Sequence, residues 1–314
     1  MASGSGMVVL AALAGNLAVA AVKFIAFAFT RSTAMLTEAI HSCVDTSDQI
    51  LLLVGQTRAA KPPDERHPFG HGMETYFWSF VVALMIFFVG GAVSIWQGLE
   101  RILHPAPLER AWINYLVLAL SAVFEGSSFV VAYREYKRTV GARKIRLLPF
   151  LAASKDPSLF SSLLEDGAAL TGLALAAVGV TASTYLGLYW ADGAASIAIG
   201  VLLLGVAVFL ANETRSLIAG EAAHPTVIAR IHEVLDKDPL VVAVRALNTL
   251  HLGPEIILVA AEITVCPGLD GDAMQDAIAA LRDHIADADE RIGPIYLSPC
   301  SRPLRKSLKK AAAA

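Results

Sequence analysis

The sequence predicts an α-helical membrane protein with six transmembrane helices followed by a small cytoplasmic αββαβ domain. Of its 314 residues, 55% are hydrophobic and only 17% are charged, which is more apolar surface than a water-soluble fold of this size needs to bury. The apolar residues also fall in runs of the roughly 20 residues that a helix needs to cross about 30 Å of hydrocarbon. After about residue 213, charged and apolar residues alternate instead, and no further run of spanning length follows.

Basic residues between the apolar runs predict the orientation of the helices. They gather after the second and fourth runs, whereas the loops on the other face carry fewer. Because basic loops resist translocation, both termini are expected on the cytoplasmic side. The first run has no basic start or cleavage site, so we interpret it as a retained helix and not as a signal peptide. The predicted spans are 8–29, 34–54, 76–99, 112–133, 159–180 and 189–211, and the basic loop residues are Arg58, Lys61, Arg66, Arg134, Lys137, Arg138, Arg143, Lys144 and Arg146.

The change of composition predicts the domain bounds. We expect a membrane domain at 1–212, a cytoplasmic domain at 213–300 and a basic, disordered tail at 301–314. Within the second domain, a helix is expected to start at His224-Pro225, and Asp270 can cap a later helix. Strands are expected at 241–250, 256–265 and 292–297.

Several classes of function are excluded by what the sequence lacks. Cys43, Cys266 and Cys300 are far apart and form no C-x-x-C pair, so neither a disulfide framework nor a thiolate zinc knuckle is indicated. The net charge of −3 gives no basic surface for nucleic acid. No G-x-x-x-x-G-K-[ST] loop, H-E-x-x-H motif or Ser/His nucleophile arrangement is present, which argues against an ATPase or an intramembrane enzyme.

Ionisable residues inside the second predicted span are the first candidates for a functional site. Such groups cost a few kcal/mol each in a bilayer, so those that remain usually have a function. Imidazole and carboxylate at i and i+4 can hold one cation from one helix, and zinc accepts these ligands. The alternative is a hydrogen-bonded polar network inside the bundle. The candidates in the second span are Glu38, His41, Asp45 and Asp48, which form a stripe along one helical face. The fifth span adds Glu165 and Asp166.

A second candidate lies in the loop KPPDERHPFGHGMET after the second span. Asp64, His67 and His71 have the spacing D-x-x-H-x-x-x-H, and the prolines and glycines around them shape a short connection. By spacing alone, an ordinary exposed loop with two histidines is the more common outcome.

These motifs resemble the cation diffusion facilitator family. The resemblance covers nearly the whole chain: Asn16, EAIHSCVD at 38–45, HPFGHGMET at 67–75, LLEDGAAL at 163–170, WADGAASIAIG at 190–200 and LIAGEAAHP at 217–225. It implies a homodimeric metal/proton antiporter with six transmembrane helices and a cytoplasmic αββαβ domain of metallochaperone (ferredoxin-like) fold.

The resemblance also implies site residues. His41 and Asp45 match the H-x-x-x-D pair of the transport site, and Asp166 matches the second member of the fifth-span pair. The first member is usually His or Asp, but here it is Ser162, so water, Ser162 itself or a nearby carboxylate is left to fill the fourth corner. The loop residues match the second metal site of some bacterial relatives.

Two further stretches, FFVGGAVSIWQGLERILHP and EGSSFVVAYREY, resemble the branch that includes mitochondrial zinc exporters. Lys23 and Glu125 are charges that this branch tends to keep. Either is a candidate proton carrier, and the alternative is that they pair across helices and hold the bundle together.

The second domain is expected to dimerise and not to sense metal. Relatives bind zinc there through histidines at strand ends, but the corresponding positions here are Arg245, Ala261, Tyr296 and Ser298. His251 is expected to be an ordinary turn histidine, and the remaining histidines of the domain, which are His224, His232 and His284, are expected to be solvated.

The function expected from all these features is export of a divalent cation, zinc first, in exchange for protons. Glu38 and the loop acids would guide the ion, Glu38, Asp48, Glu125 and Glu165 would line its path or carry protons, and protonation of His41 would release it. No cofactor is expected beyond the transported ion. The expected membrane is the bacterial inner membrane. The alternatives left open are a manganese, iron or cobalt exporter and a transport-inactive partner subunit.

Overall fold

The computed structural model describes residues 3–108, 110–140 and 157–299. Its contacts divide the chain into two compact units, Met1–Lys61 with Glu74–Ser216 and Pro62–Met73 with Leu217–Ala314. The predicted tail, the basic residues Arg143, Lys144 and Arg146, and Cys300 lie outside the described residues.

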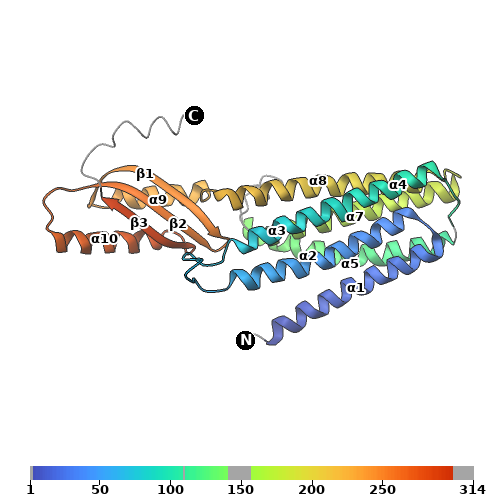
Figure 1. Ribbon diagram of the computed structural model, residues 1–314, viewed down its shortest axis with the longest axis horizontal. Helices are drawn as coiled ribbons and strands as arrows, with labels where there is room; N and C mark the ends of the chain where they lie inside the picture. The colour runs from blue at the N-terminus through green and yellow to red at the C-terminus, as the bar shows by residue number, and fades with distance from the viewer. Residues whose placement is uncertain (1–2, 109, 141–156, 300–314) are drawn as a thin grey trace. The chain divides into compact units, whose positions relative to one another are not determined.

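The first unit is a bundle of long helices that run alongside one another (Figure 1). In the described part of the chain, four of its stretches are long and apolar enough to cross a membrane: the continuous run Glu74–Leu103, α5, α7 and α8. The continuously described side chains of α1 cover only the apolar stretch Gly15–Thr30, and α2 carries several ionisable residues, so six spans remain a prediction. The elements are α1 (Ser3–Thr30), α2 (Thr33–Ala59), α3 (Glu74–Met85), η1 (Ile86–Ala92), α4 (Val93–Leu103), α5 (Ala111–Val140), α7 (Pro157–Tyr185) and α8 (Ala191–Gly220).

Glycines let the third apolar stretch pack closely on α8. A Cβ atom at Gly98 would lie 2.6 Å from the carbonyl oxygen of Gly193, and one at Gly193 would lie 2.7 Å from the carbonyl oxygen of Gly98. A similar contact is made by Gly91, which lies in the π-helical segment η1. A Cβ atom at Gly200 would lie 2.9 Å from the carbonyl oxygen of Gly91. Small residues are the usual means by which membrane helices approach backbone to backbone.

Asp192, in the first turn of α8, holds the tight turn between α1 and α2. Its Oδ2 accepts hydrogen bonds from the Thr33 amide (2.6 Å) and the Thr33 hydroxyl (2.7 Å), and its Oδ1 accepts one from Ser32. Arg31, in the same turn, has a φ of 57°, a conformation that is uncommon outside glycine. Asp192 is fully buried, and these donors supply the hydrogen bonds that a buried carboxylate requires.

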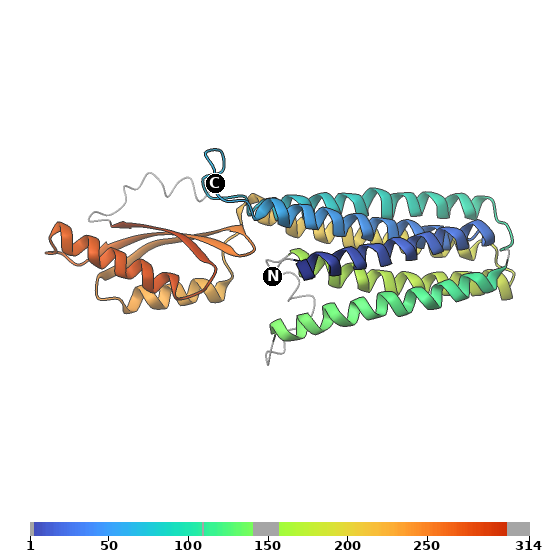
Figure 2. The same ribbon diagram turned by 90° about the horizontal axis from the view of Figure 1, so that it is seen from below.

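The second unit contains a three-stranded sheet with two helices on one face (Figure 2). The strands lie in the order β1-β2-β3, with β1 antiparallel to β2 and β2 parallel to β3. Burial alternates along β2, and its inward residues Ile257, Val259, Ala261 and Ile263 pack with apolar residues of the helices. The elements are α9 (Pro225–Lys237), β1 (Val241–Gly253), β2 (Ile256–Val265), α10 (Gly271–Ala286) and β3 (Ile292–Pro299).

The loop of residues 62–73 belongs to this second unit and not to the helices that it connects. A Cβ atom at Gly72 would clash with the carbonyl oxygen of Leu252, so the loop backbone lies directly against the end of β1. Phe69 meets Tyr296 of β3 edge to face, with the ring centroids 6.4 Å apart. The loop is therefore packed on the sheet.

The glycine contact between α4 and α8 makes a testable prediction. Gly98→Ala places a methyl group against backbone atoms that cannot rotate away, so we expect a loss of about 1–3 kcal/mol of stability. Gly205→Ala is the matched control, because a Cβ atom there meets nothing within 4 Å. It should be neutral or gain roughly 0.5–1 kcal/mol through the better helix propensity of alanine. Thermal unfolding of the two purified variants measures the difference, and equal stability would contradict the close contact.

Candidate functional site

A polar cavity of about 320 Å³ lies among α1, α2, α5 and α7 of the first unit. Its acidic lining residues are Asp45, Glu125, Glu165 and Asp166, and its other polar lining includes Asn16, Gln49, Ser162 and three further serines. Hydrophobic residues of the same helices form the surrounding core. A cavity with several acids and no lining lysine or arginine is suited to a cation.

Three carboxylates converge beside this cavity. Asp45, Asp48 and Glu165 each offer an oxygen, and these oxygens lie within 4.8 Å of one another. Asp48 is fully buried, and neither of its carboxylate oxygens has a hydrogen-bond partner, as is also true of Oε1 of Glu165. Buried carboxylates without donors are costly unless a proton or a metal ion neutralises them. The cluster can therefore hold either.

The residues that the sequence predicted as metal ligands occupy neighbouring positions. His41 is buried, with Nδ1 3.4 Å from Oδ1 of Asp45, but it is not among the residues that line the cavity. Asp166 does line the cavity, and its Oδ2 accepts a hydrogen bond of 2.9 Å from the Ser128 hydroxyl. Ser162 lines the same cavity. Asp45 is thus the residue common to the predicted set and to the convergent carboxylates.

Asp48 and Glu165 were predicted only as path residues, and the proximity of Glu165 to Asp45 could not be read from the sequence. Asp48 follows Asp45 by three residues and therefore shares its helix face. Glu165 and Asp166 are adjacent on α7, so their side chains leave the helix in directions about 100° apart. Which of the two meets Asp45 is decided by how α7 is rotated against α2.

A second set of charges lies on the other side of Asp45, toward the Thr33 end of α2. The Lys23 ammonium donates to Oγ of Ser42 at 2.7 Å and to Oε2 of Glu38 at 3.2 Å, and it lies 3.7 Å from Oε1 of Glu125. Lys23 and Glu38 are fully buried. The pairing of Lys23 with Glu125, considered above as an alternative, is present, and Glu38 and Ser42 complete it.

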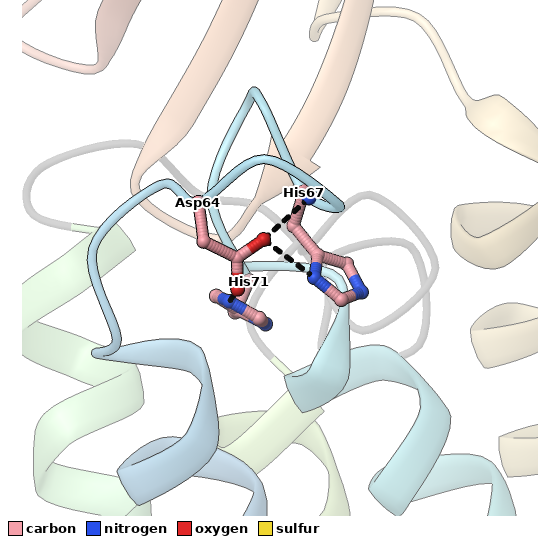
Figure 3. A group of neighbouring side chains, drawn as sticks. All are labelled: Asp64, His67 and His71. Carbon is pink, nitrogen blue, oxygen red and sulfur yellow. Dashed lines mark hydrogen bonds and ion pairs between the residues drawn. The ribbon is translucent and has the colours of Figure 1, made fainter.

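The loop residues Asp64, His67 and His71 form the second cluster (Figure 3). Oδ1 of Asp64 accepts from the backbone amides of Arg66 (2.9 Å) and His67 (2.6 Å) and lies 3.1 Å from Nδ1 of His67. Oδ2 lies 3.2 Å from Nε2 of His71. The amide of His67 is the main reason that the pKa of Asp64 is lowered to about 2, so the loop presents a carboxylate that stays ionised in acid.

The histidines of the second domain do not form a further group. His251 was expected in a turn, but it lies in β1 and is 1% exposed, because β1 continues three residues past the predicted end of the strand. His224 caps α9, His232 is exposed, and His284 lies 3.4 Å from Asp238. Outside the loop, the described part of the second unit has no cluster of three metal-compatible side chains.

Comparison with known proteins identifies the family. The model of the cation efflux transmembrane domain matches residues 9–219. The mitochondrial proton-coupled zinc antiporter SLC30A9 of Xenopus laevis is 34% identical over 262 residues, which cover 83% of this chain and 46% of that protein. The human SLC30A9 is 35% identical over 252 residues, which cover 80% of this chain and 44% of that protein.

A plant relative, metal tolerance protein C4 of Arabidopsis thaliana, is 29% identical over 248 residues, which cover 79% of this chain and 54% of that protein. The chain thus spans about half the length of these curated relatives. The family model covers more than half of the chain, and it includes every residue that lines the polar cavity. The family expected from the motifs is confirmed: the chain belongs to the cation efflux family, whose members are transporters and not enzymes.

Proposed function

We propose that the protein exports a divalent cation, zinc in the first place, in exchange for protons. The observation that carries the proposal is the group of buried carboxylates without donors beside the polar cavity of the membrane unit. Asp45 is its centre, with Asp166, Glu165 and Asp48 as the further oxygen ligands and His41 as the nitrogen ligand. Similarity to proteins that are named proton-coupled zinc antiporters supports the choice of ion and of counter-ion.

The exchange follows from the chemistry of these ligands. Carboxylate and imidazole groups must lose their protons to bind a metal ion, so binding releases protons. When the cavity opens to a side with more protons, protonation of the same groups displaces the ion. Each cycle therefore moves metal and protons in opposite directions without another source of energy.

The proposed topology places both termini in the cytoplasm, with six spans in residues 1–212 and a dimerising domain in residues 213–300. Basic residues at the ends of α2 and α5 support this orientation. The loop cluster of Asp64, His67 and His71 then faces the cytoplasm and serves as an accessory metal site.

Manganese is the second candidate substrate, because the convergent ligands at Asp45, Asp48 and Glu165 are all oxygens. Oxygen ligands suit harder ions such as manganese, whereas a histidine nitrogen favours zinc. The contribution of His41 therefore decides between the two ions.

The central test is transport by the purified protein in liposomes. Imposing a pH gradient should drive zinc across the membrane, and Asp45→Asn should lower the initial rate by about tenfold or more, since even outer-shell partners of metal sites contribute 10–100-fold. His232→Ala, at an exposed position of α9, is the control and should transport normally. Equal rates for the parent and Asp45→Asn would refute the site, and failure to move any divalent ion would refute the function.

Ion selectivity tests the role of His41. If His41 binds the ion, His41→Ala should reduce zinc transport roughly tenfold while manganese transport changes less, because only zinc gains strongly from the imidazole. Parallel uptake assays with both ions in the same liposome preparation give the ratio. A ratio unchanged by His41→Ala, together with loss of both ions in Glu165→Gln, would assign the site to carboxylates alone.

The loop site is tested by its pH dependence. Because the pKa of Asp64 is lowered to about 2, its carboxylate is ionised at every pH well above that value and is lost as a ligand only as the pH falls through 2. Zinc released from the loop well above pH 2 therefore does not result from protonation of Asp64. Asp64→Asn retains an oxygen for the two backbone amides but removes the charge, so it should weaken loop binding without unfolding the loop.

Equilibrium dialysis of zinc against the full chain carrying Asp45→Asn measures the loop site while the cavity site is weakened. Unchanged binding in Asp64→Asn would contradict the assignment. His232→Ala again serves as the control histidine.

A further inference from the structure

Lys23 occupies a cation site that the protein has already built. Three oxygens surround its ammonium group: Oγ of Ser42 at 2.7 Å, Oε2 of Glu38 at 3.2 Å and Oε1 of Glu125 at 3.7 Å. They come from α2 and α5, whereas Lys23 comes from α1. Two carboxylates and a hydroxyl around one point form a ligand set that suits a hard metal ion.

These three oxygens of Ser42, Glu38 and Glu125, called the oxygen cage below, adjoin the polar cavity. Ser42 and Glu125 line the cavity themselves, and Ser42 lies one helical turn from Asp45. Lys23 and Glu38 do not line it and are fully buried behind it. The ammonium group therefore lies directly behind the cavity wall, on the side toward the Thr33 end of α2.

The packing around Glu38 shows that its place is fixed. A Cβ atom at Gly172 of α7 would lie 2.6 Å from Oε1 of Glu38, so the glycine provides the room for this carboxylate. Its other oxygen is held by Lys23. Glu38 is thus held from two sides, with one oxygen next to Gly172 and the other bonded to the ammonium group of Lys23.

We infer that the ammonium group of Lys23 keeps Glu38 and Glu125 from binding the transported ion and so confines the metal site to the neighbourhood of Asp45. A divalent ion would bind in the oxygen cage if the ammonium group were absent. While Lys23 is present, a metal ion there would meet a like charge at contact distance. This inference rests on the proposed function, and it assigns to Lys23 a specificity role and no direct contact with the ion.

The inference differs from a purely structural role in what it predicts for metal binding. Removing a lysine that only holds helices together would lower stability and leave the number of bound ions unchanged. Removing a lysine that occupies a cation site should create an additional site. The number of bound metal ions per chain therefore separates the two roles.

The experiment counts zinc and manganese bound to the purified full chain, in a background where Asp64, His67 and His71 are all alanine so that the loop adds nothing. Lys23→Met should bind one more ion per chain than its parent, and Lys23→Met with Glu38→Gln should return to the parent count. Lys237→Met is the control, because Lys237 forms an exposed pair with Glu233 at 2.6 Å. A folded Lys23→Met with an unchanged count would overturn the inference.

Breaking a buried ion pair can prevent folding, so a variant that removes the whole ion cluster provides a second test. Lys23→Met combined with Glu38→Gln and Glu125→Gln removes the ammonium group and both carboxylates together. It should bind as many ions as the parent, with an affinity within about twofold, if neither carboxylate is a ligand in the parent. Loss of the parent's ion would show that Glu38 or Glu125 binds it and would overturn the inference.

The same measurements separate this inference from the proposed function. A parent that binds no divalent ion in this background contradicts the metal site at Asp45, whereas the ion gained in Lys23→Met is still counted from that baseline. A parent that binds one ion, with no gain in Lys23→Met and loss in the triple variant, contradicts the role of Lys23 alone.

Discussion

The burial of charge along α2 is the constraint on which the arrangement of the membrane unit depends. One face of this helix carries Glu38, His41, Asp45 and Asp48, all but Asp45 nearly or fully inaccessible. Ionised groups in hydrocarbon require counter-charges, hydrogen bonds or water. Neighbouring helices meet that requirement in different ways along the stripe, and the differences divide it into two parts.

At the Thr33 end, α1 supplies a positive charge, and the result is a closed ion cluster around Lys23. Around Asp45 and Asp48, α7 supplies more carboxylates, and the result is a group that is stable only with protons or a metal ion. Along α2 the two parts adjoin, because Ser42 of the first part is one helical turn from Asp45 of the second. The glycine-mediated contact of α4 with α8 lies outside this polar stripe and joins the remaining helices.

Much of this arrangement could be predicted from the sequence because it depends on local spacing. Ionisable residues three and four apart in an apolar run must share a helix face, and the Asp64, His67 and His71 spacing lies within one short loop. What could not be predicted depends on contacts between distant segments. The choice of Glu165 as a neighbour of Asp45 depends on the rotation of α7, and the capture of Glu38 by Lys23 depends on the register between α1 and α2. The grouping of loop 62–73 with the C-terminal sheet depends on Gly72 fitting against Leu252.

Under the proposed exchange, the charges in and around the cavity are balanced when one divalent ion replaces two protons. Six carboxylates, those of Glu38, Asp45, Asp48, Glu125, Glu165 and Asp166, lie within this part of the bundle, and Lys23 contributes the fixed positive charge among them. All six cannot be ionised together at low dielectric without further cations, because each unpaired buried charge costs several kcal/mol. A divalent ion that replaces two protons leaves the buried charge unchanged. Under the inferred role of Lys23, its ammonium group offsets part of this carboxylate charge, which leaves less charge for the transported ion and the protons to share.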